Sequence, residues 1–221
     1  MRRRLAALPL AVALAWSLPA GATAQSTDGE AIAARSARVY RSLTSLTADF
    51  TQTIEDEALG RLESRGTLVQ AGQNKLAMRF SDPKGEAIVI DGTHVWVYTP
   101  STTPGQVIRS AVPTGASYGF NILAWLLDRP TERYRITYLR RDFVDFVPVD
   151  VLEFQPRSSD LPFRRAVLWI DRDTSLPRRL EIEEQPGAVR TLSLARIRTN
   201  QPVTASTFRF DVPSGVRVIE Q

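Results

Sequence analysis

The sequence predicts a mainly β protein with helices (α+β), built on a strongly curved, barrel-like and mostly antiparallel sheet of about ten or eleven strands. Most of the chain beyond residue 46 alternates apolar and polar side chains with a period of two, which is typical of strands with one buried face. Short connections between these stretches favour antiparallel pairing. Two stretches with helical spacing, 28–46 and 120–127, are apolar on one face, and a helical lid over the concave side of the sheet would bury both.

The first 24 residues predict a cleavable export signal. Three arginines at positions 2–4 precede an apolar stretch over residues 5–18, and Ala-Thr-Ala at 22–24 is a small-x-small cleavage site. A lipid-anchored protein would have a cysteine after this site, whereas this chain has Gln25. We therefore expect a signal peptide over 1–24 and a single domain over 25–221, exported to the periplasm or the cell exterior without a lipid anchor of its own.

The elements follow in a simple order. Thr27 or Asp28 can cap the first helix, and apolar residues at helical spacing predict that this helix ends at residue 46. The predicted strands then cover 48–54, 66–70, 75–80, 86–90, 94–99, 134–138, 147–154, 164–171, 180–183, 189–198 and 208–210, and residues 107–110 are a further candidate. The second helical stretch, 120–127, interrupts them and ends before Pro130. Asp91-Gly92 is the strongest hairpin signal in the chain.

Charge and residue usage exclude several classes of protein. Three of the 28 Lys and Arg residues lie in the signal, which leaves 25 basic against 24 acidic residues. This near balance, without a basic run, argues against a nucleic-acid partner. The chain has no cysteine and one histidine, and the acidic pair around Arg172 lacks the remaining ligands of a calcium loop. We therefore expect no metal and no cofactor.

One motif points to catalysis. Residues 115–119, Gly-Ala-Ser-Tyr-Gly, match the G-x-S-x-G pattern of serine hydrolases. That pattern requires a buried strand directly before it and a histidine after it, but Pro113 precedes it and the single histidine, His94, comes earlier in the chain. We therefore expect no enzyme. An esterase that uses Ser117 stays as an alternative, and it requires that Ser117→Ala removes hydrolysis of an acyl ester.

The remaining candidates are apolar. Large side chains on the predicted strands face the side chains of the second helical stretch, either as an ordinary core or as a pocket for long acyl chains. Moving a methylene group out of water contributes about 0.8 kcal/mol, so a carrier of acyl chains needs apolar area and a movable cover rather than catalytic groups. The candidate lipid-binding residues are Phe50, Ile54, Leu68, Leu76, Met78, Phe80, Trp96, Tyr98, Phe120, Ile122, Leu123 and Leu126.

Several short motifs in this order resemble the LolA family of periplasmic lipoprotein carriers from diderm bacteria, over roughly residues 40–218. They are Phe-Thr-Gln at 50–52, Asp-Pro at 82–83, the D-G-x-x-x-W-x-Y-x-P pattern at 91–100 and the closing F-x-F-x-x-P-x-G pattern at 208–215. The resemblance implies an unclosed β-barrel with a helical lid. It also implies a ligand surface at Leu76, Met78 and Phe80 on the strand and at Phe120, Ile122 and Leu123 on the lid.

The resemblance further implies a function and partners. The carrier would take acylated lipoproteins from an inner-membrane ABC-type release complex and pass them to an outer-membrane receptor, and we expect it to act as a monomer. Many family members have a basic residue followed by proline between the second and third strands, and that basic residue helps hold the lid shut. This chain has Gly72-Gln73 there, which leaves open whether the latch is absent, moved or supplied by Lys75 or another arginine. A carrier of another envelope lipid, such as a phospholipid or hopanoid, or a sensor of misplaced lipoproteins, is the alternative on the same fold.

Overall fold

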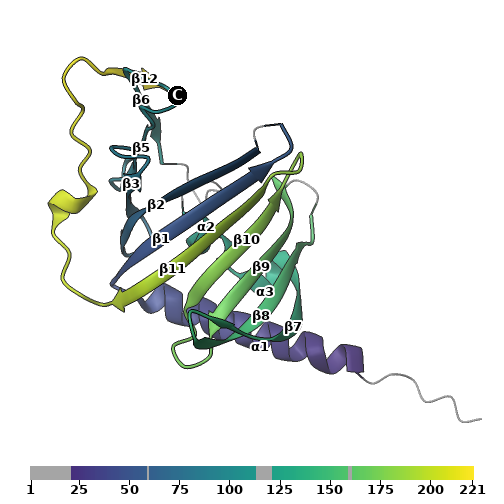
Figure 1. Cartoon of the computed structure of the whole chain (residues 1–221). Coiled ribbons are helices and arrows are strands. Elements are labelled where there is room, and N and C mark those ends of the chain that lie inside the picture. The colour runs from purple at the N-terminus through teal and green to yellow at the C-terminus, as the bar shows by residue number, and fades with distance from the viewer. Residues whose placement is uncertain (1–20, 59, 113–120, 159–160) are drawn as a thin grey trace, which may run out of the picture.

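The computed structural model describes residues 21–58, 60–112, 121–158 and 161–221, with side chains from residue 28 onward. In this part of the chain twelve strands form one sheet, in the order β12-β6-β5-β4-β3-β2-β1-β11-β10-β9-β8-β7 (Figure 1). The strands are β1 (Ser45–Asp56), β2 (Gly60–Ala71), β3 (Lys75–Asp82), β4 (Ala87–Ile90), β5 (His94–Tyr98), β6 (Gln106–Ala111), β7 (Tyr134–Val144), β8 (Val147–Pro156), β9 (Phe163–Asp171), β10 (Pro177–Glu184), β11 (Val189–Thr199) and β12 (Arg217–Glu220).

The sheet curves strongly but does not close. Neighbouring strands pair antiparallel except at one edge, where β12 lies parallel to β6. The first and last strands of the sheet order, β12 and β7, remain edges, so the barrel is open. The prediction of an unclosed, curved and mostly antiparallel sheet is therefore confirmed.

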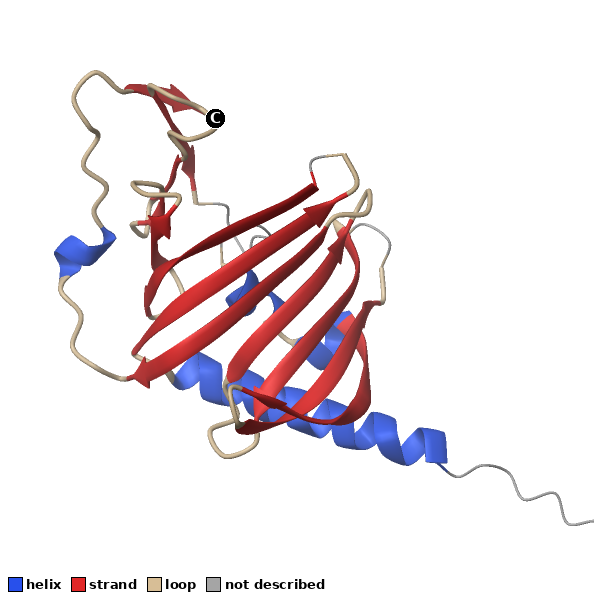
Figure 2. Ribbon diagram, in the orientation of Figure 1, coloured by secondary structure: helices blue, strands red, loops and turns tan. Residues whose placement is uncertain are grey.

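The helices cover the concave side of the sheet (Figure 2). They are α1 (Gly21–Ser42), α2 (Ile122–Leu126) and α3 (Pro130–Arg133), and a 3-10 helix, η1 (Ala205–Phe208), lies in the C-terminal segment. Helix α1 packs on β7 and α3. The approach is close, because a Cβ atom at Gly29 would stand 2.9 Å from the backbone nitrogen of Tyr138. Glycine is therefore required at this point of contact.

The main core lies between the concave face and the helices. Alternation directs Leu46, Ala48 and Phe50 of β1 inward, and each is at most 2% exposed. The same face of the other strands supplies aliphatic and aromatic side chains that pack with Ala33 and Tyr40 of α1. Burial of these side chains is the main stabilising term of the fold.

The convex face carries two smaller apolar clusters. We call the first the strap cluster: the C-terminal segment lays Phe208 and Phe210 over Ala77 and Val89. The second is the hairpin cluster, in which the β7–β8 hairpin curls over the convex face. Its members are Val149, Val151, Val167 and Trp169, with Leu139 and Val144 packed against them. Between these two clusters, the middle of the convex face lacks an apolar cover within the described residues.

Several predicted boundaries differ from the structure: β2 starts at Gly60 rather than at 66, β7 runs to Val144 rather than to 138, and α3 was not expected. The first helix ends at Ser42, and Leu46, predicted as helical, lies in β1. Ser45 donates a hydrogen bond to the carbonyl of Gln201 (2.6 Å), so long-range contacts start the strand before the helical pattern ends. The strand predicted at 208–210 is the end of η1 followed by an extended segment, whereas β12 was not expected. Four residues that pair parallel with a distant strand leave too short a pattern to detect.

The Asp91-Gly92 turn is confirmed between β4 and β5. One Asp91 oxygen accepts hydrogen bonds from the backbone N–H groups of Thr93 (2.8 Å) and His94 (2.7 Å), and the other accepts from the Trp96 indole (2.9 Å). Burial acts to raise the pKa of Asp91, but these hydrogen bonds outweigh it and hold the pKa well below its ordinary value.

We predict that Asp91→Ala lowers the free energy of unfolding by about 2 kcal/mol at neutral pH. Because the pKa of Asp91 is lower in the folded than in the unfolded chain, its contribution is present above about pH 4 and is lost as the pH falls further. Urea unfolding should therefore show that the free energy of unfolding falls less between pH 7 and pH 3 in the variant than in the unmodified protein. Asp145→Ala, at an exposed turn residue, is the control. An equal decrease in the free energy of unfolding from pH 7 to pH 3 in Asp91→Ala and the unmodified protein would contradict this role.

Candidate functional site

Eight of the twelve candidate residues meet on the concave face. Phe50 and Phe80 pack edge to face with ring centroids 5.1 Å apart, and helix α2 lies over this region of the sheet. Phe80 and Ile122 are partly buried against the main core, and the others are buried within it. The eight residues, which we call the lid site, are Phe50, Leu68, Leu76, Met78, Phe80, Ile122, Leu123 and Leu126.

The structure separates the other candidates from the lid site. Trp96 and Tyr98 point to the convex face, where each ring lies 5.6 Å from the ring of Phe210 in the strap cluster. Alternation directs Val95 and Val97 of the same strand inward in their place. Ile54 is half-buried farther along β1 and outside the described clusters. Phe120, like Ser117 and the predicted signal up to residue 20, lies outside the described residues.

A small cavity lies between the lid and the sheet. Its volume is about 30 Å³, comparable to one water molecule, so side chains of the protein fill the site in this conformation. Sequence reasoning missed several of its lining residues, which alternate inward on β4, β10 and β11. The cavity is lined by Gln52, Met78, Ile88, Ile122, Leu180, Ile182, Arg190 and Leu192. A ligand of more than a few atoms would have to displace α2.

A buried polar network, which we call the lid latch, holds the N-terminal end of α2. Gln70 of β2 is 2% exposed, and its side-chain oxygen accepts hydrogen bonds from Tyr40 of α1 (2.5 Å) and from Asn121 (3.3 Å). The Gln70 amide nitrogen donates to the carbonyl of Gly72 (2.8 Å). Asn121 also caps α2, since its side-chain oxygen accepts from the backbone N–H of Ala124 (3.2 Å). The three side chains thus join α1, the sheet and the lid.

The lid latch is electrically neutral. Two of its side chains are amides, and burial raises the pKa of the Tyr40 hydroxyl far above its ordinary value, although the hydrogen bond to Gln70 partly opposes this shift. The phenol therefore stays protonated over the physiological range. The latch lies next to Gly72-Gln73, because Gln70 donates its amide hydrogen bond to the carbonyl of Gly72.

The C-terminal end of α2 is held by Arg133 of α3. Its guanidinium donates a hydrogen bond to the carbonyl of Trp125 (2.8 Å) and lies 4.3 Å from the centre of the Trp125 ring. Such cation–π contacts contribute about 0.5–2 kcal/mol. Helix α2 is therefore a short cover, packed on apolar side chains and fixed by polar contacts at both ends.

These features define a class of protein before any comparison: one with an open sheet whose apolar concave face lies under a small helical cover. Among the described residues no group of three or more His, Cys, Asp and Glu side chains could hold a metal ion. No described helix is both long and apolar enough to cross a membrane.

Comparison with known proteins identifies the family. The family described as outer membrane lipoprotein carrier protein LolA matches residues 41–211, and the chain belongs to this family. The outer-membrane lipoprotein carrier protein of Alkalilimnicola ehrlichii is 27% identical over 215 residues, which are 96% of this chain and 95% of the relative. That of Chromohalobacter salexigens is 27% identical and covers 96% of each chain. An uncharacterized conserved protein from Thermus thermophilus has the same fold, with a TM-score of 0.56, 14% identity and 88% and 99% of the two chains covered.

We predict that Asn121→Ala loosens the lid without unfolding the protein. The change removes both the cap of α2 and its hydrogen bond to Gln70, at a cost of about 1 kcal/mol each. Amide hydrogen exchange of residues 122–127 should accelerate about 30-fold, while global unfolding by urea changes little by comparison. Gln73→Ala, at the exposed position after Gly72, is the matched control and should leave both the amide exchange of residues 122–127 and the global stability unchanged. Equal exchange in the two variants would show that the lid latch does not restrain α2.

Proposed function

We propose that this protein is a periplasmic carrier, exported by the signal at residues 1–24, that binds the acyl chains of lipoproteins and moves them from the inner to the outer membrane. One observation supports it above all: part of the apolar concave face lies under α2, a helix of five residues that polar contacts hold in place. Membership of the LolA family and the names of its curated relatives support the choice of cargo.

The acyl chains would lie between the sheet and α2, on the lid site. Leu76, Met78 and Phe80 would form the floor, and Ile122, Leu123 and Leu126 the cover. Phe120 precedes the lid and would extend the cover, while Ile54 would lie toward the opening along β1. Trp96 and Tyr98 are not part of this proposal, because they stand on the convex face in contact with Phe210.

The energetics favour exchange rather than simple filling. Displacing three aliphatic side chains of α2 from the core would cost about 5–9 kcal/mol, at about 1.5–3 kcal/mol each. One acyl chain with about 15 methylenes would recover about 12 kcal/mol on burial. The difference is a moderate affinity, which suits a protein that must both accept and release its cargo.

This balance also indicates where the energy of transfer comes from. The proposed mechanism needs no nucleotide site in this chain, because an inner-membrane ABC-type release complex would supply the cargo in a loaded form. An outer-membrane receptor with a tighter site would then draw the acyl chains from the moderate one. A single copy of the chain supplies both the sheet and the lid, so the proposal requires only a monomer.

We predict that Met78→Glu abolishes binding of a triacylated lipopeptide. The carboxylate would stand on the floor of the lid site, and an acyl chain cannot cover a charge without a large desolvation penalty. Fluorescence titration measures the binding, and circular dichroism checks that the variant is folded. Thr67→Glu, on the exposed convex side of β2, is the matched control and should bind normally. Unchanged binding by folded Met78→Glu would contradict the proposed site.

Cargo identity requires a test in the native host. A photo-crosslinking amino acid at position 78 should capture acylated lipoproteins, and the same amino acid at position 67 should not. Capture of free phospholipid or hopanoid would favour a carrier of another envelope lipid. A folded protein without any adduct would mean that this strand face is ordinary core.

A further inference from the structure

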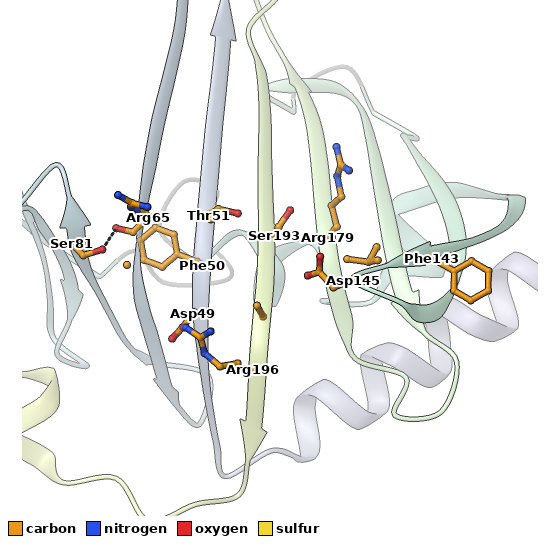
Figure 3. Close-up of a pocket in the computed structure, with 13 residues that line it drawn as sticks. Asp49, Phe50, Thr51, Arg65, Ser81, Phe143, Asp145, Arg179, Ser193 and Arg196 are labelled. Atoms are coloured by element: carbon orange, nitrogen blue, oxygen red, sulfur yellow. Dashed lines mark hydrogen bonds and ion pairs between the residues drawn. The ribbon is translucent and has the colours of Figure 1, made fainter.

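The uncovered middle of the convex face contains a groove, on the opposite side of the sheet from the lid site. Its volume is about 590 Å³. Side chains from five neighbouring strands and from the β7–β8 hairpin line it, and Figure 3 shows Arg65 and Ser81 at one end and Arg179 and Asp145 at the other. The hairpin cluster and the strap cluster cover the convex face on either side, so the groove is the part of this face that the chain leaves open.

The dimensions of the groove fit a short extended peptide. It crosses β3, β2, β1, β11 and β10, and four inter-strand spacings of about 4.8 Å give about 19 Å. An extended chain advances about 3.3 Å per residue, so about six residues span this distance. The volume lies within the range of about 300–1,000 Å³ that ligand sites occupy, and it is too small for a folded domain.

Arg179 supplies the chemistry at one end. Its guanidinium lies 4.9 Å from the centre of the Trp169 ring, which holds the side chain in place on the convex face. Its Nε atom is buried and has no hydrogen-bond partner, and no described carboxylate lies within ion-pair distance of the residue. A buried donor without a protein acceptor favours any ligand that brings one, and a carboxylate fits a guanidinium best.

The other charges of the groove are already satisfied. Arg65 pairs with Asp82 (3.5 Å), and Arg196 forms an ion pair with Asp49. Asp145, at the hairpin turn, is exposed and therefore hydrated. Arg179 is thus the one lining charge that combines a buried donor with the lack of a described partner.

The hairpin adds an apolar wall and an unusual exposed aromatic. Phe143 lines the groove and is 70% exposed, and Phe146 at the turn is 99% exposed. Phe146 has a φ of 64°, a left-handed conformation that disfavours bulky residues and that glycine normally supplies in such turns. An exposed phenylalanine in strained backbone is costly to the free protein, and large aromatic side chains of this kind are typical anchors of protein interfaces.

We propose that this convex groove binds a short extended segment of a partner protein, one that presents a carboxylate to Arg179 beside an apolar side chain that packs on Phe143. This function goes beyond the proposed transport of acyl chains and does not depend on it, because the two sites lie on opposite faces of the sheet. The groove is a docking site for a partner while the concave face carries cargo.

The test uses protein purified from the periplasm and labelled with ¹⁵N, titrated with the hexapeptide acetyl-Thr-Val-Glu-Val-Thr-Ser-amide. The Trp169 indole N–H, which lies under Arg179 and donates to Asp142 (3.3 Å), reports occupancy in NMR spectra. It should shift, while the indole signals of Trp96 and Trp125 stay in place. Replacing the glutamate of the peptide by glutamine should weaken binding about tenfold, and raising the salt from about 0.05 M to about 0.5 M should weaken it further.

Variants locate the interaction. Arg179→Met keeps an apolar contact with Trp169 but removes the charge, and it should weaken binding of the glutamate peptide about tenfold. Arg164→Met removes an exposed charge of β9 outside the groove and should change nothing. Neither variant should affect binding of the triacylated lipopeptide, so failure here is distinguishable from failure of the lid site. No shift of the Trp169 signal, or equal affinities for the glutamate and glutamine peptides, would overturn the proposal.

Discussion

The structure depends on burial of the concave apolar face of an open sheet. A twelve-stranded sheet that curves without closing exposes this face unless other elements cover it, and two very different helices do so. Helix α1, with 22 residues, packs closely on the β7 edge. Helix α2 has five residues, far below the length at which an isolated helix is stable, so it owes its conformation to its contacts. The proposed exchange with a ligand therefore involves α2 rather than α1.

The lid latch suits this exchange because it is neutral. A buried charge that lost its partner on lid opening would be left with a large desolvation penalty, whereas a neutral hydrogen bond contributes only about 1 kcal/mol net. When Asn121 leaves, Gln70 keeps its bonds to Tyr40 and Gly72, so no member of the network is stranded. In the proposed mechanism, opening would therefore cost the apolar contacts of α2 and the contacts of Arg133 with Trp125, but would strand no charge of the lid latch.

The alternation of apolar and polar residues predicted where the strands lie better than it predicted which face of the sheet each side chain occupies. A period of two identified β1, β3 and the β4–β5 hairpin, and the inward set of Leu76, Met78 and Phe80 is confirmed. The faces of β5 could not be assigned, because both are apolar: the C-terminal strap, more than a hundred residues away in the chain, covers the outer one. The lid latch was missed although a signal existed, since Gln70 is a polar residue two positions after inward-facing Leu68. Its partners Tyr40 and Asn121 are brought to it only by the tertiary fold.

The strands that floor the lid site also floor the convex groove. On β10 the groove residue Arg179 is followed by the cavity residue Leu180, and on β11 Leu192 faces inward beside outward Ser193. Because successive side chains of a strand point to opposite faces, the two sites lie on opposite sides of the same strands, and Phe50 is the lid-site residue that also lines the groove. If cargo replaces α2 as proposed, this backbone would stay paired on both sides, so the convex face would keep its shape. A partner docked in the proposed groove would then not compete with the acyl chains.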